Sequence, residues 1–573
     1  MTSSRGQNRS LEPVRRAVAA AVVAVLAVAH VAGQSAPVRS RAGMVVASDR
    51  IAAEVGRDVL RDGGSAADAT VATAFALAVT FPSAGNIGGG GFLIYRGADG
   101  EAVAYDFRET APAAASAEMF LAGGEYDAAR HHDSHVAVGV PGSVAGLHRV
   151  WVDHGRLPWR RLVEPAVALA GDGFELTVDR AAAFAGVLPR MARYPASVAA
   201  FSKDGTPYSA GERFRQPELA ATLERIAEGG PDGFYRGRTA ELIAREMAAN
   251  GGLITEADLA AYEAHAREPI RGTYRGHEVI SMPPPSSGGV TLVQMLNVLE
   301  GYDLAEAGHG SALNVHRMIE AMRRGFADRA RHLGDPDFNP RMPVAELTSK
   351  AYAGRQRATI DPARASASGP ERFEWPPVGD ETTHVSVVDA DRNAVSLTTT
   401  LEQSYGSKIV VPGGGFLLNN EMGDFNAGPG LTTENGLIGT EPNLAAPGKR
   451  MLSSMTPTIV TRDGRLALVT GSPGGRTIIN TVLHTIVNVI DFGMNVQEAI
   501  DAPRFHHQWL PDVVRYERRG LSPDTLALLE TRGHRLQAIR AQGAAHAIAL
   551  DPDSDLLEGA PDRRRPDAAA AGY

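Results

Sequence analysis

Two threonines stand near the open end of a predicted hairpin, where they could supply a hydroxyl nucleophile. The chain has no cysteine, so thiolate chemistry is excluded. The β-prone runs 385–389 and 393–397 flank a turn centred on Asp391. Thr382 and Thr400 each lie nine residues from Asp391, so antiparallel pairing places them opposite each other. By itself this pattern is more typical of a threonine-rich surface hairpin than of an active site.

A threonine hydroxyl is a weak nucleophile unless a nearby base takes its proton. No histidine of the chain lies in a familiar serine–histidine setting. Cleavage of the Glu381–Thr382 bond would make Thr382 an N-terminal residue, and its free α-amine could then act as that base. The sequence therefore predicts chain cleavage at this bond if the hairpin is catalytic.

A glycine-rich turn at 471–476 reads Gly-Ser-Pro-Gly-Gly-Arg. It follows the strand-like run 466–470 and precedes the helix-like run 477–490. A turn of this kind exposes unpaired backbone N–H groups at a helix N-terminus, where they can bind an oxyanion. An ordinary strand-to-helix turn would have the same pattern, so this motif alone leaves both interpretations open.

Seven motifs occur in order along the chain: Gly88-Gly-Gly-Gly-Phe92, Asp106-Phe-Arg-Glu-Thr-Ala-Pro112, Val138-Gly-Val-Pro-Gly-Ser143, Thr382-Thr-His384, Leu418-Asn-Asn420, Leu452-Ser-Ser-Met455 and Gly471-Ser-Pro-Gly-Gly475. Together they resemble the γ-glutamyltransferase (glutathione hydrolase) family, from about Gly43 to Tyr573. The resemblance implies a self-processing enzyme that cleaves the γ-glutamyl amide of glutathione and related compounds. The group would pass through a γ-glutamyl-threonine ester to water or to amino acids and peptides.

The resemblance also implies roles for individual residues. Thr382 would be the nucleophile, Thr400 would orient it, and Gly474 and Gly475 would bind the oxyanion. The donor's α-carboxylate would be bound by Arg108, through a two-pronged contact that a guanidinium makes, together with Ser453 and Ser454. The donor's α-ammonium would face Glu402, Glu421 and Asp424.

Two positions depart from the better-known family pattern. Glu402 stands where many members carry asparagine, although one bacterial branch also has glutamate. Within 429–449, which has the length of the family's lid over the donor pocket, Asn435 stands where a tyrosine is common. These departures concern lid closure and the balance of hydrolysis and transfer.

The predicted fold class is α+β. Helical spacing marks 48–80, strand-like runs lie at 92–95 and 102–105, and 144–347 is predicted to be mostly helical. The family resemblance sharpens this to a four-layer αββα sandwich of the N-terminal-nucleophile hydrolase type. Residues 34–381 would form the large subunit and 382–573 the small one, and this heterodimer would share one core.

The first 33 residues are predicted to be a signal peptide. Four arginines, Arg5, Arg9, Arg15 and Arg16, precede an Ala/Val run from Ala17 to Ala32. The mature protein should be exported, periplasmic or secreted, with no stable membrane insertion. An uncleaved anchor is the alternative.

Composition excludes several other functions. A net charge of −9, with no basic tract beyond Arg563-Arg-Arg565, argues against nucleic acid as a partner. No metal or cofactor is expected: 131–135 lacks the His-Glu-x-x-His pattern, and its histidines are interpreted as exposed loop residues. His506 and His507 are interpreted as structural. The expected partners are small γ-glutamyl donors and amine acceptors.

Two rival functions remain. A relative that removes glutaryl side chains from β-lactams would use the same nucleophile, but it has no need for three acids that bind an ammonium. An exported binding protein that is never cleaved would keep the pocket without its chemistry.

Overall fold

The computed structural model describes residues 35–368, 382–431 and 440–573. Pro37–Tyr573 form one compact unit. Three sequence predictions fall outside the described residues: the signal peptide at 1–33, Glu381 of the cleavage site, and Asn435 of the lid. Within the described part, no helix is both long and apolar enough to cross a bilayer.

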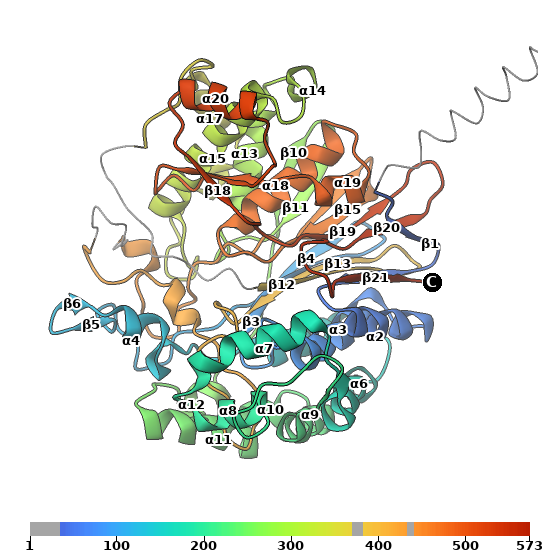
Figure 1. Cartoon of the computed structure of the whole chain (residues 1–573), viewed down its shortest axis with the longest axis vertical. Coiled ribbons are helices and arrows are strands. Elements are labelled where there is room, and N and C mark those ends of the chain that lie inside the picture. The colour runs from blue at the N-terminus through green and yellow to red at the C-terminus, as the bar shows by residue number, and fades with distance from the viewer. Residues whose placement is uncertain (1–34, 369–381, 432–439) are drawn as a thin grey trace, which may run out of the picture. The chain divides into compact units, whose positions relative to one another are not determined.

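Two seven-stranded sheets form the centre of this unit (Figure 1). The first has the order β1 (Val38–Ser40), β20 (Leu557–Ala560), β19 (His546–Leu550), β15 (Arg465–Gly471), β14 (Thr458–Arg462), β11 (His277–Ser281) and β10 (Ile270–Tyr274). The second has the order β21 (Ala569–Gly572), β2 (Met44–Ala47), β12 (Thr382–Val388), β13 (Ala394–Thr400), β3 (Gly90–Arg96), β4 (Ala102–Phe107) and β9 (His265–Arg267). All neighbouring strands in both sheets are antiparallel.

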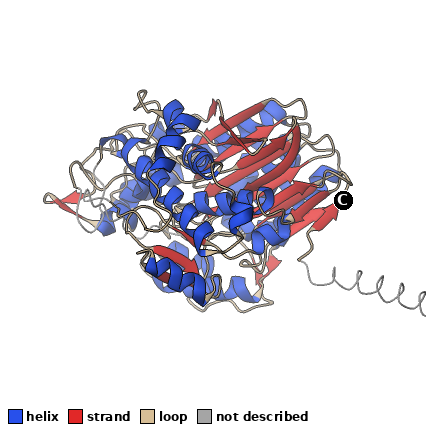
Figure 2. Ribbon diagram, turned by 90° about the horizontal axis from the view of Figure 1, so that it is seen from above, coloured by secondary structure: helices blue, strands red, loops and turns tan. Residues whose placement is uncertain are grey.

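Helices cover the outer face of each sheet (Figures 1 and 2). The first sheet is covered by α13 (Gly288–Leu299), α15 (Ala312–His332), α17 (Lys350–Ala358), α18 (Thr477–Ile490), α19 (Val496–Asp501) and α20 (Pro523–Thr531). On the second sheet and beyond it lie α2 (Arg50–Arg61), α3 (Ala66–Thr80), α5 (Ser143–His154), α6 (Trp159–Asp172), α7 (Val178–Met191), α8 (Pro195–Phe201), α9 (Pro217–Gly229), α10 (Asp232–Tyr235), α11 (Gly237–Asn250) and α12 (Glu256–Ala260).

Three apolar cores correspond to the three interfaces between these layers. One joins the helices to the second sheet, one joins the other helices to the first sheet, and a smaller one lies between the sheets around Phe92, Ile94 and Ile459. This is a four-layer αββα arrangement, so the predicted fold class is confirmed.

The β12–β13 hairpin has the register predicted from its turn. Thr382 pairs with Thr400, and the ladder continues to Val388 and Ala394. Asp389 holds the turn, because its carboxylate accepts hydrogen bonds from the N–H groups of Asp391 and Asn393. β12 also pairs with β2, and β13 with β3. The hairpin therefore lies in the middle of the sheet, with a strand on each side, and not on the surface of the protein.

Other local predictions are also confirmed. The helix after the glycine turn is α18, at the predicted bounds Thr477–Ile490. The stretch 144–347 is largely helical, but the prediction missed β9, β10 and β11, of which β10 and β11 complete one edge of the first sheet.

Candidate active site

A cavity opens at the ends of the central strands β12 and β13. Its lining includes nine of the ten residues predicted for catalysis and donor binding: Arg108, Thr382, Thr400, Glu402, Glu421, Asp424, Ser453, Ser454 and Gly475. Gly474 is not in the lining but adjoins it in the same turn. Arg329, Met455, Arg476 and Ile478 also line this cavity, and no role was predicted for them.

Thr382 is the first residue of β12, so the proposed cut would fall before the strand and leave the strand whole. Residues directly opposite in an antiparallel pair have Cβ atoms about 4.5–5.5 Å apart, which places the Thr400 side chain beside that of Thr382. The Thr400 hydroxyl accepts a hydrogen bond of 2.8 Å from the Glu402 N–H. Glu402 adopts a φ of 76°, an uncommon conformation for a residue other than glycine, which turns the chain after β13.

The glycine turn is fixed from both sides. The Gly474 carbonyl accepts hydrogen bonds from the Thr477 N–H (3.0 Å) and the Thr477 hydroxyl (2.7 Å). The Ser472 hydroxyl oxygen accepts from the Ala544 N–H at 3.0 Å. Gly474 has a φ of 130°, and a Cβ there would lie 2.5 Å from Thr477 Oγ1, so only glycine fits.

Arg108 follows β4 directly, and its side chain is fully buried. Its backbone N–H donates to Asp106, and its Nε donates to the Met451 carbonyl at 3.3 Å. Its two terminal nitrogens pair with Glu421 and Asp424 on the short helix η2 (Glu421–Asp424). Burial opposes the charge of Arg108, but these carboxylates outweigh it and raise the pKa of the guanidinium. Arg108 therefore stays charged.

Glu402 differs from the paired acids. Neither of its carboxylate oxygens makes a well-formed hydrogen bond within the described residues, although the side chain is buried. His132 Nδ1 lies 3.7 Å from Glu402 Oε1. Burial, and secondarily the charge of Asp424, raise the pKa of Glu402 well above its ordinary value. Such an acid is poised to receive a cation.

The histidines at 131–135 are not exposed loop residues, so that interpretation was wrong. His131 belongs to α4 (Ala128–His132), and both it and His135 are buried. The His131 ring packs on Phe120 with a centroid distance of 3.9 Å, and His135 Nε2 contacts Glu246 at 2.9 Å. Burial comes from the packing of distant segments, which a local polar pattern does not reveal. His506 and His507 are buried and hydrogen-bonded, as expected of structural residues.

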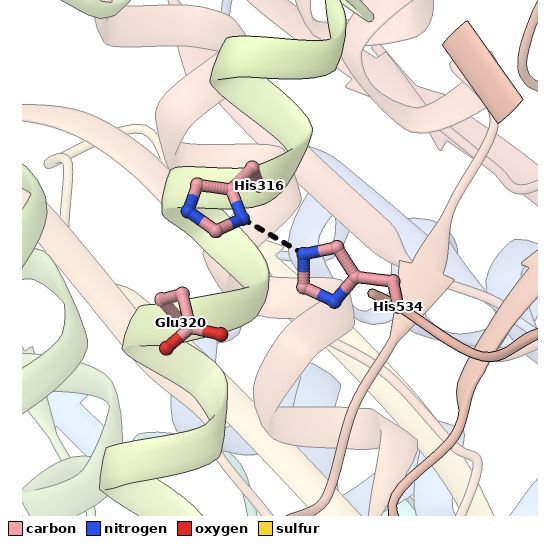
Figure 3. A group of neighbouring side chains, drawn as sticks. All are labelled: His316, Glu320 and His534. Atoms are coloured by element: carbon pink, nitrogen blue, oxygen red, sulfur yellow. Dashed lines mark hydrogen bonds between the residues drawn. The ribbon is translucent and has the colours of Figure 1, made fainter. Parts of the chain in front are cut away.

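A second group of ionisable side chains lies away from the cavity, and we call it the His316 junction (Figure 3). His316 and Glu320 extend from α15 toward His534, and ligand-type atoms of the three lie within 4.8 Å of one another. However, His316 Nδ1 is hydrogen-bonded to His534 Nε2 at 2.8 Å. Glu320 is paired with Arg324 at 2.6 Å and Arg323 at 3.3 Å. These two arginine charges oppose a divalent cation, so the junction fits a structural role better than a metal site.

The family model for gamma-glutamyltranspeptidase matches residues 52–572. The chain belongs to the gamma-glutamyltranspeptidase family. The resemblance inferred from seven motifs is thereby confirmed, and with it the enzyme class.

The chain is similar to proteins with two kinds of name, glutathione hydrolase and acylase. The chain is 49% identical to a glutathione hydrolase proenzyme of Escherichia coli K12, over 94% of this chain and 93% of that protein. It is 39% identical to the acylase ACY 1 proenzyme of Pseudomonas sp. SE83, over 94% and 95%. Among solved structures, a cephalosporin acylase from Bacillus halodurans has a TM-score of 0.82 at 28% identity, covering 94% of this chain and 97% of that one.

Proposed function

We propose that the chain is a self-processing γ-glutamyltransferase and glutathione hydrolase with Thr382 as its nucleophile. The observation that carries the proposal is the position of Thr382, opposite Thr400, in a cavity lined by both arginine and carboxylate side chains. A γ-glutamyl donor carries an α-carboxylate and an α-ammonium, so a site of mixed charge suits it. The relatives named glutathione hydrolase support the choice of glutathione as a donor.

Cleavage before Thr382 would supply the base that its hydroxyl needs. In the mature enzyme the Thr382 α-amine takes the hydroxyl proton as Oγ1 attacks the γ-carbonyl carbon. The N–H groups of Gly474 and Gly475 hold the oxyanion, and Thr400 orients the attacking hydroxyl. The amine then gives its proton to the leaving nitrogen as the C–N bond breaks, which leaves a γ-glutamyl ester. Water or an acceptor amine, deprotonated by the same group, attacks the ester carbonyl and restores Thr382.

Donor binding requires an exchange of ionic partners at Arg108. In the free site its nitrogens pair with Glu421 and Asp424. The donor's α-carboxylate takes a place on the guanidinium, and its α-ammonium takes a place among the carboxylates. Each buried charge thus keeps an opposite partner, which avoids the cost of an unpaired buried ion. Glu402, without a well-formed hydrogen bond, supplies the remaining negative charge to the ammonium.

A glutaryl acylase is the second candidate, supported by the likeness to the cephalosporin acylase structure and to ACY 1. A glutaryl group has the distal carboxylate but no ammonium. Glu402, Glu421 and Asp424 would then place three acids around an anion with too little positive charge to balance them. We therefore favour the γ-glutamyl donor.

The test compares wild-type protein with Thr382→Ala on a denaturing gel and in an anilide assay. Wild type should give two fragments, starting after the signal peptide and at Thr382, and should cleave a γ-glutamyl anilide faster than a glutaryl anilide. A dipeptide acceptor should raise the rate if transfer competes with hydrolysis. Thr382→Ala should remain one chain without activity. Activity in an uncut wild-type protein would refute the mechanism, and a preference for the glutaryl anilide would favour the acylase.

For the protein in its natural setting, we propose export to the periplasm or medium. The basis is the arginine-flanked apolar run that ends at Ala32. Mass spectrometry of the native large fragment should find a start between about Val28 and Ala36. A native protein that begins at Met1 and stays in the cytoplasm would contradict this.

A further inference from the structure

Arg329 is a buried cation of the donor cavity to which the mechanism above gives no role. It lies near the end of α15, 4% exposed, and it lines the cavity with Arg108 and Asp424. Burial lowers the pKa of Arg329 to about 10, so it remains charged near neutral pH. A positive charge in this position favours the binding of an anionic group in the cavity.

The contacts of Arg329 join two segments that meet at the cavity. Its Nη2 donates to Ser454 Oγ at 2.9 Å. Its Nε donates to Ser287 Oγ at 2.7 Å. Ser287 in turn donates from its hydroxyl to the Ser453 carbonyl at 2.6 Å, so the guanidinium and Ser287 together fix the backbone and side chains at 453–454.

The direction of these hydrogen bonds follows from chemistry. A guanidinium has only donors, so Ser454 Oγ must accept from Arg329. The hydroxyl hydrogen of Ser454 then has to point elsewhere, and no acceptor for it is recorded among the described residues. Ser453 is held in the same way, because its Oγ accepts from the Met455 N–H at 3.1 Å. Both serines line the cavity, so both hydroxyl hydrogens are available to an anion there.

We propose that Arg329 is a positioning residue for the donor's α-carboxylate, because it holds the Ser454 hydroxyl with its hydrogen directed into the cavity. This inference rests on the proposed γ-glutamyl donor and identifies a specificity determinant of the same site. Arg108 gives the carboxylate its ionic partner, and Arg329 gives it an aligned hydroxyl donor by holding Ser454. Discrimination between glutamyl donors and analogues without the α-carboxylate therefore depends on Arg329.

The experiment compares two ligands that differ only in that group. L-Glutamate and 4-aminobutanoate share the ammonium and the carboxylate at the γ position of glutamate. 4-Aminobutanoate lacks the α-carboxylate. Their dissociation constants are measured by calorimetry on mature wild type and Arg329→Gln. Glutamate should bind about tenfold more weakly to the variant, the scale of one charge-assisted hydrogen bond. 4-Aminobutanoate should change less than about twofold. Equal loss for both ligands, or no loss for either, overturns the proposal.

The kinetic counterpart separates positioning from general damage. Arg329→Gln should raise KM for a γ-glutamyl anilide by a similar factor, with a smaller change in kcat. Arg329→Gln combined with Ser454→Ala should be no worse than Ser454→Ala alone, because the arginine acts through that hydroxyl. Additive losses would show that it does not. Arg317→Gln, on the same helix and outside the cavity lining, is the matched control and should bind both ligands as wild type does.

Two further outcomes keep the inference separate from the proposed function. If Arg329→Gln does not mature, Ser287→Ala, which removes the other serine contact of the guanidinium, must weaken glutamate selectively, or the proposal is wrong. If wild type prefers glutaryl over γ-glutamyl compounds, the proposed function fails. If wild type prefers γ-glutamyl compounds but its selectivity for the α-carboxylate survives Arg329→Gln, only the inference fails.

Discussion

The donor cavity and the His316 junction are both buried groups of charged side chains, but they differ in how their polar atoms are satisfied. At the junction, both Glu320 oxygens are hydrogen-bonded, to Arg324 and to the Ser366 N–H among others, and one ring nitrogen, His534 Nδ1, lacks a well-formed hydrogen bond within the described residues. In the cavity, both Glu402 oxygens and one Glu421 oxygen lack a well-formed hydrogen bond within the described residues. Buried polar atoms are normally satisfied, so three open carboxylate oxygens in one cavity suit a ligand that brings its own hydrogen-bond donors.

The pKa values of the buried carboxyls differ between the two groups in the same sense. Arg323 and Arg324 lower the pKa of Glu320 to about 2 despite its burial. Burial, and secondarily the charge of Asp424, raise the pKa of Glu402 more than Lys408 and Arg108 lower it. Arg323 and Arg324 thus stabilise the charge of Glu320 in the junction. In the cavity, the proposed donor's ammonium would stabilise the charge of Glu402.

The largest expected effect is a loss of stability on substitution in the His316 junction. Glu320→Gln removes the carboxylate that faces two arginines and should lower the free energy of unfolding by about 3–5 kcal/mol. KM and kcat of the molecules that remain folded should match wild type, because the junction does not line the cavity. Thermal unfolding and initial rates measure the two effects. The control is Glu224→Gln, which removes an exposed pair with Arg160 and should change stability by less than about 1 kcal/mol. Altered kinetics in Glu320→Gln would mean that the junction is coupled to catalysis.

In the cavity the largest effect on binding should come from Arg108. Arg108→Lys keeps the charge but loses the two-pronged geometry, so donor binding should weaken by about 1.5–3 kcal/mol. Chain cleavage should still occur. KM for a γ-glutamyl anilide measures the effect. An unchanged KM in both Arg108→Lys and Arg108→Ala would remove Arg108 from the donor site.

Glu402 should affect selectivity more than rate. Glu402→Gln replaces a full charge with a dipole, so the preference for γ-glutamyl over glutaryl anilides should fall about tenfold. The ratio of kcat/KM for the matched pair measures this preference. A ratio that does not change would assign the ammonium to Glu421 and Asp424 instead.

The smallest effect should be a dependence on pH. Glu402 must lose its proton to pair with the ammonium, so in wild type the γ-glutamyl preference should rise with pH through the raised pKa of Glu402. In Glu402→Gln the preference should not change with pH.

The stability of the wild-type protein should instead fall as pH rises. A carboxyl with a raised folded-state pKa contributes most to stability below its unfolded pKa, and that contribution is lost as pH rises through the folded-state pKa. The melting temperature of Glu402→Gln should therefore fall less than that of wild type between pH 5 and 9. Parallel curves would contradict this.

The features that could be predicted from sequence depend on local rules. The tight turn at Asp391 fixes which residues pair, so the equal spacing of Thr382 and Thr400 from that turn was enough to place them opposite each other. The glycine turn was likewise located by the strand before it and the helix after it. β10 and β11 were missed because Arg271-Gly-Thr-Tyr-Arg-Gly-His277 is polar and glycine-containing and resembles a turn.

Contacts between distant segments could not be predicted in this way. Arg329 is one of several basic residues on α15, and nothing in the local pattern distinguishes it from Arg331. Its role depends on how α15 packs against 453–454. The pairing of Arg108 with Glu421 and Asp424 also joins residues more than 300 positions apart. Arg476, by contrast, is the last residue of the glycine-rich turn 471–476, and that position was a signal for its place in the cavity.

The interleaving of strands has a consequence for the protein's lifetime. Segments before and after Thr382 alternate in both sheets, and they share ladders at β1–β20, β11–β14, β2–β21, β2–β12 and β3–β13. In a chain cut before Thr382, these five pairs of hydrogen-bonded strands would hold the two fragments together. Neither fragment could then dissociate without unfolding. Before the cut, refolding is a first-order process. After it, the two pieces must meet again, and recovery from denaturant depends on their concentration. Maturation would thereby turn a reversible fold into an assembly that persists because it opens slowly.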